Sequence, residues 1–146
     1  MESLNPNEKM GLMLSTREQK MGLMFFDEMK KRYNEGDDSL ELTMEKWERI
    51  FEYSKTVFHL SHFHEVYKAA AVPVFLCKEY ANQCRMCPIY NICKQGHSDN
   101  WTTLMRVVQA YVIAGDLLPK DPFQGNIETF LKKLKICREE FYSKMH

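Results

Sequence analysis

The chain has 146 residues and a mass of 17.4 kDa, a length typical of one domain that can bury a hydrophobic core without disulfides. Hydrophobic residues make up 45% of it, and 20 basic side chains balance 20 acidic ones, which argues against both an intrinsically disordered chain and a strongly polyanion-binding one. No basic and apolar leader opens the sequence, and no apolar run reaches the length of a membrane span. We therefore expect a soluble, cytoplasmic protein that does not associate with membranes.

Methionine and glycine recur near the start of the chain. An imperfect repeat, KMGLML at 9–14 and KMGLMF at 20–25, places its two copies eleven residues apart, which is close to three helical turns. Either one helix contains both copies on one face, or a short helix precedes a longer one that ends near Gly36. Six of the ten methionines lie in the first 29 residues, and we interpret this methionine stripe as part of the core.

Three helical patterns follow the polar turn at 35–39. Thr43 is expected to cap a helix whose inward positions are Trp47, Ile50, Phe51, Ser54, Val57 and Phe58. The same spacing recurs at Phe63, Val66, Tyr67 and Ala70. Pro73 then fits the first turn of a short helix that carries Phe75, Leu76 and Cys77. This short helix would present Cys77 from a packed support and not from a loose loop.

Two longer helices are predicted in the last third of the chain. Ser98 or Asn100 can cap the first, which ends before Gly115 and has its apolar face at Trp101, Leu104, Met105, Val108, Tyr111 and Val112. Residues 117–125 are interpreted as a structured loop because they contain two prolines and a glycine. Asn126 is expected to cap the last helix, whose inward residues are Ile127, Phe130, Leu131, Leu134, Cys137 and Phe141.

No segment of useful length alternates apolar and polar residues as a half-buried strand does. The sequence therefore predicts an all-α fold in which residues 1–146 form a single compact helical domain of five to seven helices. A cysteine-rich segment at 77–97 interrupts this helical pattern and is the candidate metal-binding loop.

Four of the five cysteines lie within seventeen residues, Cys77, Cys84, Cys87 and Cys93, with the spacing C-x6-C-x2-C-x5-C. In a reducing compartment such clustered thiols are more typical of metal or cluster ligands than of disulfides, and an odd total favours the same interpretation. Cys84 and Cys87 can bind one centre from a tight turn. Pro88 can start a short helix up to Cys93, with its first amides directed toward the thiolates. The fifth cysteine, at the inward position 137, is expected to be buried.

The spacing of these four cysteines resembles the [4Fe-4S] cluster loop of the endonuclease III and adenine-mismatch DNA glycosylases. The segment CPIYNIC at 87–93 looks like the end of the latter's loop, and the half-motif from Cys84 to Cys93 is also similar to that of WhiB-like regulators, which hold a [4Fe-4S] cluster. The resemblance implies a cluster on Cys77, Cys84, Cys87 and Cys93. It covers only residues 77–93, and the Leu-Pro-Gly-Val-Gly segment of those glycosylases is missing, so their activity is not implied.

Zinc is the alternative cofactor, because four thiolates also suit tetrahedral zinc. The interval from Cys87 to Cys93 and on to His97 matches the second half of a CCCH zinc finger, an RNA-binding module, and makes His97 an alternative ligand. A second group of imidazoles at His59, His62 and His64 could reach a metal, although local hydrogen bonding at a helix end is the simpler role for such residues.

No sequence signature indicates an enzyme, because the chain contains neither a glycine-rich phosphate loop nor a Gly-x-Ser-x-Gly elbow. No small-molecule substrate is identified. The leading hypothesis is a metal-binding regulatory or nucleic-acid-associated protein with a [4Fe-4S] cluster, whose partner is DNA, RNA or a protein. The alternative is a zinc-stabilised interaction or inhibitor protein that docks through its methionine- and aromatic-rich helices. The basic run at 132–138 is interpreted as the solvated face of the last helix.

Overall fold

The computed structural model describes residues 22–57 and 59–144, and within these ranges it contains helices and no β-strand. The all-α prediction is confirmed. The α-helices are α2 (Phe26–Asn34), α3 (Ser39–Ser54), α4 (Leu60–Ala70), α5 (Phe75–Glu79), α6 (Tyr90–Cys93), α7 (Asp99–Ala114) and α8 (Asp121–Lys144). Short 3-10 helices are η1 (Cys84–Met86), η2 (Lys94–Gly96) and η3 (Gly115–Leu117).

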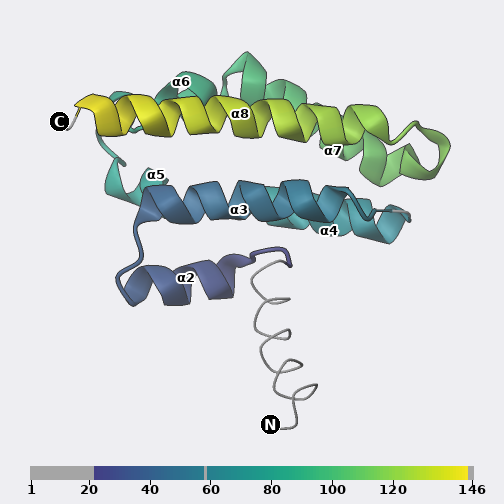
Figure 1. Cartoon of the computed structure of the whole chain (residues 1–146), viewed down its shortest axis with the longest axis horizontal. Coiled ribbons are helices and arrows are strands. Elements are labelled where there is room, and N and C mark those ends of the chain that lie inside the picture. The colour runs from purple at the N-terminus through teal and green to yellow at the C-terminus, as the bar shows by residue number, and fades with distance from the viewer. Residues whose placement is uncertain (1–21, 58, 145–146) are drawn as a thin grey trace, which may run out of the picture.

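Four long helices form the body of the molecule. Helices α3 and α4 make one hairpin and α7 and α8 another; α3 packs on α8, and α4 packs on α7, so that the four helices surround one core. Figure 1 shows the two hairpins as two layers, with α2 on the outer side of α3. The connection from α4 to α7 carries α5 and α6 and crosses between the layers at the left of that view.

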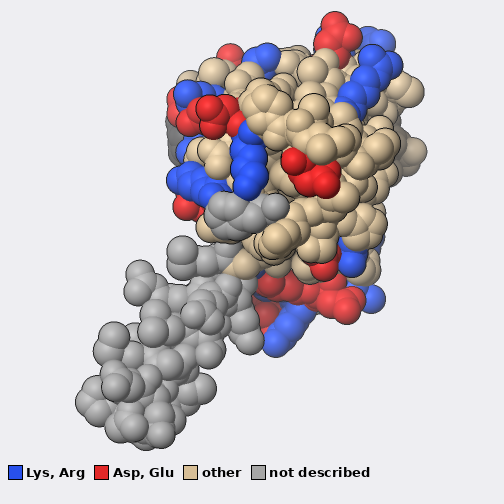
Figure 2. Space-filling view, turned by 90° about the vertical axis from the view of Figure 1, so that its right-hand side faces the viewer, with Lys and Arg blue, Asp and Glu red and all other residues tan. Residues whose placement is uncertain are grey.

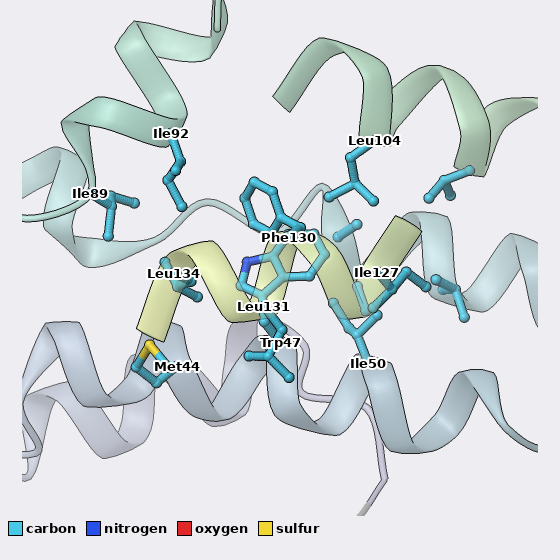
Figure 3. Close-up of a cluster of buried hydrophobic side chains, with 14 of the residues drawn as sticks. Met44, Trp47, Ile50, Ile89, Ile92, Leu104, Ile127, Phe130, Leu131 and Leu134 are labelled. Carbon is cyan, nitrogen blue, oxygen red and sulfur yellow. The ribbon is translucent and has the colours of Figure 1, made fainter. Parts of the chain in front are cut away.

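The core lies between these layers and is rich in aromatic rings. Trp47 of α3 packs on Phe130 of α8, with ring centroids 4.7 Å apart, and meets Trp101 of α7 edge-on at 6.0 Å. Ile89 and Ile92 reach the same core from the cysteine-containing connection (Figure 3). Burying side chains of this size stabilises the fold by about 1.5–3 kcal/mol each. The connection is therefore anchored in the core and is not a peripheral loop.

The predicted N-cap of α3 is wrong by five residues. Thr43 lies inside the helix, where it is buried and its hydroxyl donates to the Ser39 carbonyl at 2.8 Å. The N-cap is Asp38, whose carboxylate accepts the Glu41 amide at 3.0 Å. Both residues are good caps, and Asp38 is preferred because helix formation from that point also buries Leu40 and Leu42.

Helix α2 begins at Phe26, so the part of the predicted longer helix that would cover 22–25 is not helical. Met24 and Met29 are nevertheless buried, together with Leu42 of α3, in a small second core. For these two methionines the core interpretation is confirmed. The first copy of the repeat, the short helix proposed before the longer one and the start of the second copy lie outside the described residues.

The last helix is longer than predicted. It begins at Asp121, so Asn126 is internal and its side-chain amide donates to the Pro122 carbonyl at 2.7 Å. The proline lies in the first turn, where its missing N–H breaks no helical hydrogen bond. Gly125 costs only about 1 kcal/mol inside a helix, which burial of Phe123 and Ile127 offsets.

Candidate metal centre

The connection between α4 and α7 presents the four clustered cysteines from short, held elements. Cys77 lies on α5, and this helix is fixed from both sides: Phe75 stacks on Tyr33 with centroids 4.2 Å apart, and Glu79 accepts hydrogen bonds from the hydroxyls of Tyr33 and Ser39 at 2.9 and 2.7 Å. The short helix predicted to carry Cys77 is thus present, although it begins at Phe75, after Pro73.

The next three cysteines follow in two tight turns. Cys84 begins η1, and its carbonyl accepts the Cys87 amide at 3.0 Å; the Cys87 carbonyl in turn accepts the Tyr90 amide at 3.0 Å. The helix that Pro88 was predicted to start begins at Tyr90, because Pro88 occupies the turn before it. Cys93 is the last residue of α6.

A left-handed turn closes the segment after Cys93. Lys94, Gln95 and Gly96 all have positive φ, at 46°, 60° and 82°. Two of them carry side chains, which rarely adopt this conformation, and such residues concentrate at functional sites. The turn lets the Cys93 carbonyl accept the amides of His97 and Ser98, both at 3.1 Å. The backbone of Cys93 is therefore held in one position by the start of α7.

All four cysteines line one cavity of about 420 Å³. Cys77 is exposed and the other three are partly buried, and all four are free thiols. The remaining wall is mostly apolar and comes from α3, the residues that follow α4, α5, the turn before α6, α7 and α8. It includes Trp47, Val72, Leu76, Ile89, Trp101, Phe130 and Leu134. The structure thus brings together the four residues that the spacing singled out.

Burial in the cavity wall changes the pKa values of two of the thiols. Burial raises the pKa of Cys87 to about 11, and burial also raises the pKa of Cys77 above its usual value. The other cysteines of the cluster raise both pKa values further, because each thiolate disfavours another nearby. These thiols are therefore protonated at neutral pH in the metal-free protein, and a bound metal must displace their protons.

Among residues 22–57 and 59–144, no three histidine, cysteine, aspartate or glutamate side chains are grouped as ligands of a metal ion. The four thiols nevertheless line the same cavity. Tetrahedral zinc requires sulfur atoms about 2.3 Å from a single centre. The arrangement is thus a thiol-lined chamber, and its donor set suits a soft metal or a metal–sulfur cluster.

Sequence reasoning missed Lys46, the one charged residue among those that line this cavity. Its side chain is 2% exposed, and its ammonium donates to the carbonyls of Ala70 and Val72 at 2.9 and 2.7 Å. A signal was available: four residues before Ile50 and three after Thr43, Lys46 lies on the inward stripe of α3. A lysine on such a stripe is unusual and is a candidate functional residue.

The histidines are placed apart from the cavity. His97 is exposed and does not line it. At the opposite end of α4 from Ala70, the His59 amide donates to Nδ1 of His62 at 3.3 Å, which is a local helix-start contact, and His64 is exposed. Cys137 of α8 is only 6% exposed, as its inward position predicted.

Comparisons with known proteins add no family to this description. No protein-family model, no curated protein and no solved structure matches the chain. In the part of the chain that the structure covers, no helix is both long and apolar enough to cross a membrane. The likeness of residues 77–93 to glycosylase and WhiB-like loops stays a prediction from their spacing, and function must be inferred from the cysteine cavity itself.

Proposed function

We propose that the protein is a small cysteine-ligated metalloprotein that binds a [4Fe-4S] cluster and acts as a regulatory or nucleic-acid-associated binding protein. The ligands are Cys77, Cys84, Cys87 and Cys93. One observation carries the proposal: these four thiols, and no other cysteine of the chain, line a single cavity of about 420 Å³. Residues 77–97 form the metal-binding segment.

The donor set of the cavity is the ground for preferring a cluster, because four thiolates are the usual ligands of a [4Fe-4S] centre. A polynuclear cluster occupies the space between its ligands, whereas one ion draws four sulfur atoms to a point. The four thiols here line one cavity, and backbone hydrogen bonds hold the turns at Cys84 and Cys93. Its apolar wall would limit the access of water to a bound cluster, and solvent exposure is one of the properties that set the reduction potential of a cluster.

A cluster test uses anaerobically purified protein and two matched variants. The wild type is expected to be brown, with absorbance near 400 nm, and Cys87→Ser is expected to be colourless. Cys137→Ala is the control, because it removes a buried thiol that does not line the cavity. Loss of colour in both variants, or in neither, would contradict this assignment of ligands.

The basic side chains of α8 do not form a free phosphate-binding surface for nucleic acid, because three of them already have partners. Arg138 pairs with Glu41 at 3.1 Å, Lys132 approaches Glu128 at 4.0 Å, and Lys133 donates to Asn100 at 2.5 Å. A phosphate would have to compete with these contacts. If nucleic acid is the partner, its affinity for the loaded protein falls steeply with salt; absence of binding to DNA and RNA at low salt would refute the nucleic-acid role.

A second candidate is a zinc-stabilised interaction protein that docks through a methionine- and aromatic-rich surface. Phe25 and Phe26 support it, because they are 39% and 42% exposed beside the buried Met24. Large exposed apolar side chains next to one another are typical of protein-binding surfaces. Figure 2 shows a surface with few charged side chains at the end of the molecule that faces the viewer. Stoichiometric zinc in colourless protein would favour this candidate over the cluster.

A further inference from the structure

The buried lysine of α3 shares the chamber of the four cysteines. Lys46 lines the same cavity, and its Nζ is held at 2.9 and 2.7 Å by the carbonyls of Ala70 and Val72. The ring of Trp47 lies 5.2 Å from the same nitrogen. A long, flexible side chain is therefore fixed in one place, with its charge directed into an otherwise apolar wall.

Helix capping explains only part of this arrangement. The Ala70 carbonyl is at the C-terminal end of α4, where a positive charge interacts favourably with the helix dipole. Burial nevertheless lowers the pKa of Lys46 to about 7, so the wall by itself disfavours the charged form. The electrostatic influence that opposes this comes from Cys77, which raises the pKa of Lys46, and Lys46 in turn lowers that of Cys77. The observation that links Lys46 to the cysteine site is geometric: it is the charged residue among those that line the cavity of the four cysteines.

We propose that Lys46 is a positioning residue that provides the counter-charge of the thiolate centre and thereby favours metal loading and the more reduced state of the bound cluster. This inference rests on the proposed function. Four thiolates leave a [4Fe-4S] centre with net negative charge, and each added electron makes it more negative. A negatively charged cluster in the same cavity favours the protonated form of Lys46, and the positive charge of that form offsets part of the charge of the cluster. The net charge around a cluster is one of the properties that set its reduction potential.

Two variants separate the charge from the hydrogen bonds. Lys46→Gln keeps an N–H donor for the carbonyls near the end of α4 and removes the charge, whereas Lys46→Arg keeps the charge. Thr43→Val is the matched control, since Thr43 lines the same cavity and the change alters polarity without altering charge. We expect the reduction potential of the cluster to shift to more negative values in Lys46→Gln and to stay near the wild-type value in the other two.

A second measurement does not need the cluster. In the metal-free protein at fixed neutral pH, alkylation of Cys77 by iodoacetamide, mapped by mass spectrometry, should be slower in Lys46→Gln than in wild type, because the thiolate loses a nearby positive charge. Lys46→Arg should restore the rate. Equal rates in wild type and Lys46→Gln would overturn the inference.

The two measurements fail in different ways. If no variant and no wild-type preparation holds a cluster, the proposed function fails, while the alkylation rates still decide whether Lys46 acts on the thiols. If clusters form and the potential of Lys46→Gln equals that of wild type, the lysine is only a cap for α4. If Lys46→Gln does not fold, Lys46→Met is used in its place. Lys46→Arg retains the charge, so a changed reduction potential or alkylation rate in that variant would also contradict the inference.

Discussion

A methyl group added at Gly115 tests the packing of the two hairpins against each other. Gly115 follows α7 with φ of −61°, a conformation that alanine adopts without strain. A Cβ at this position would lie 2.5 Å from each of two ring carbons of Phe63 and 3.1 Å from a third. Phe63 is fully buried, and its ring packs on Tyr111 and Phe123 with centroids 5.3 and 4.9 Å away. The ring has no open space into which it could turn.

The expected magnitude follows from two opposing effects. Overpacking of a filled core costs about 1–3 kcal/mol, whereas replacing glycine by alanine gains about 0.5–1 kcal/mol through the unfolded state. We therefore expect Gly115→Ala to lower the free energy of unfolding by about 1–2 kcal/mol. Gly125→Ala is the control: it lies within α8, no atom is within 4 Å of its added Cβ, and it should gain about 0.5–1 kcal/mol.

Urea denaturation followed by circular dichroism measures both variants against wild type on the same chain. The two changes are chemically identical, so the difference between them isolates the contact with Phe63. If Gly115→Ala proves as stable as Gly125→Ala, the packing of α4 against the end of α7 described above is wrong.

Two further predictions concern the cysteine segment. Ser98→Ala removes a buried hydroxyl that accepts the Trp101 amide as the cap of α7 and donates to the Ile92 carbonyl. The free energy of unfolding should therefore fall by about 2–3 kcal/mol in thermal or urea denaturation. An unchanged value would show that this hydroxyl does not stabilise the fold. Because burial raises the pKa of Cys87 to about 11, alkylation of Cys87 in metal-free protein at pH 7.5 should be at least about tenfold slower than alkylation of an unperturbed thiol. The alkylation rate should keep rising with pH up to about pH 11. A plateau of the rate near pH 8.5 would contradict a buried thiol.

Helical spacing was sufficient to predict most of the long elements. The apolar residues of α4 and α7 recur with a period that only a helix explains, and the Ser98 cap was among the predicted starts. The wrong starts occurred where several residues were suitable. Thr43 and Asp38 are both residue types that cap helices, and a proline at position 122 is as compatible with a first turn as with a loop. Only the burial gained by the longer helix decides.

For the site, the cysteine spacing selected four residues that line one cavity, but it did not predict what surrounds them. Local geometry can be read from intervals of two to six residues, and Cys77 through Cys93 were chosen on that basis alone. The wall contributed by Trp47, Phe130 and the end of α4 depends on contacts between distant parts of the chain. The inward position of Lys46 could have been read from the spacing of α3, but its carbonyl partners could not, since they are 24 and 26 residues away.

The metal content of the full chain, purified without oxygen, tests the central claim most directly. Four thiols around one cavity predict about four iron and four acid-labile sulfide per chain, as a [4Fe-4S] cluster requires, and the loss of both in Cys87→Ser. Colourless protein with one zinc per chain, or with no metal, would contradict the cluster assignment.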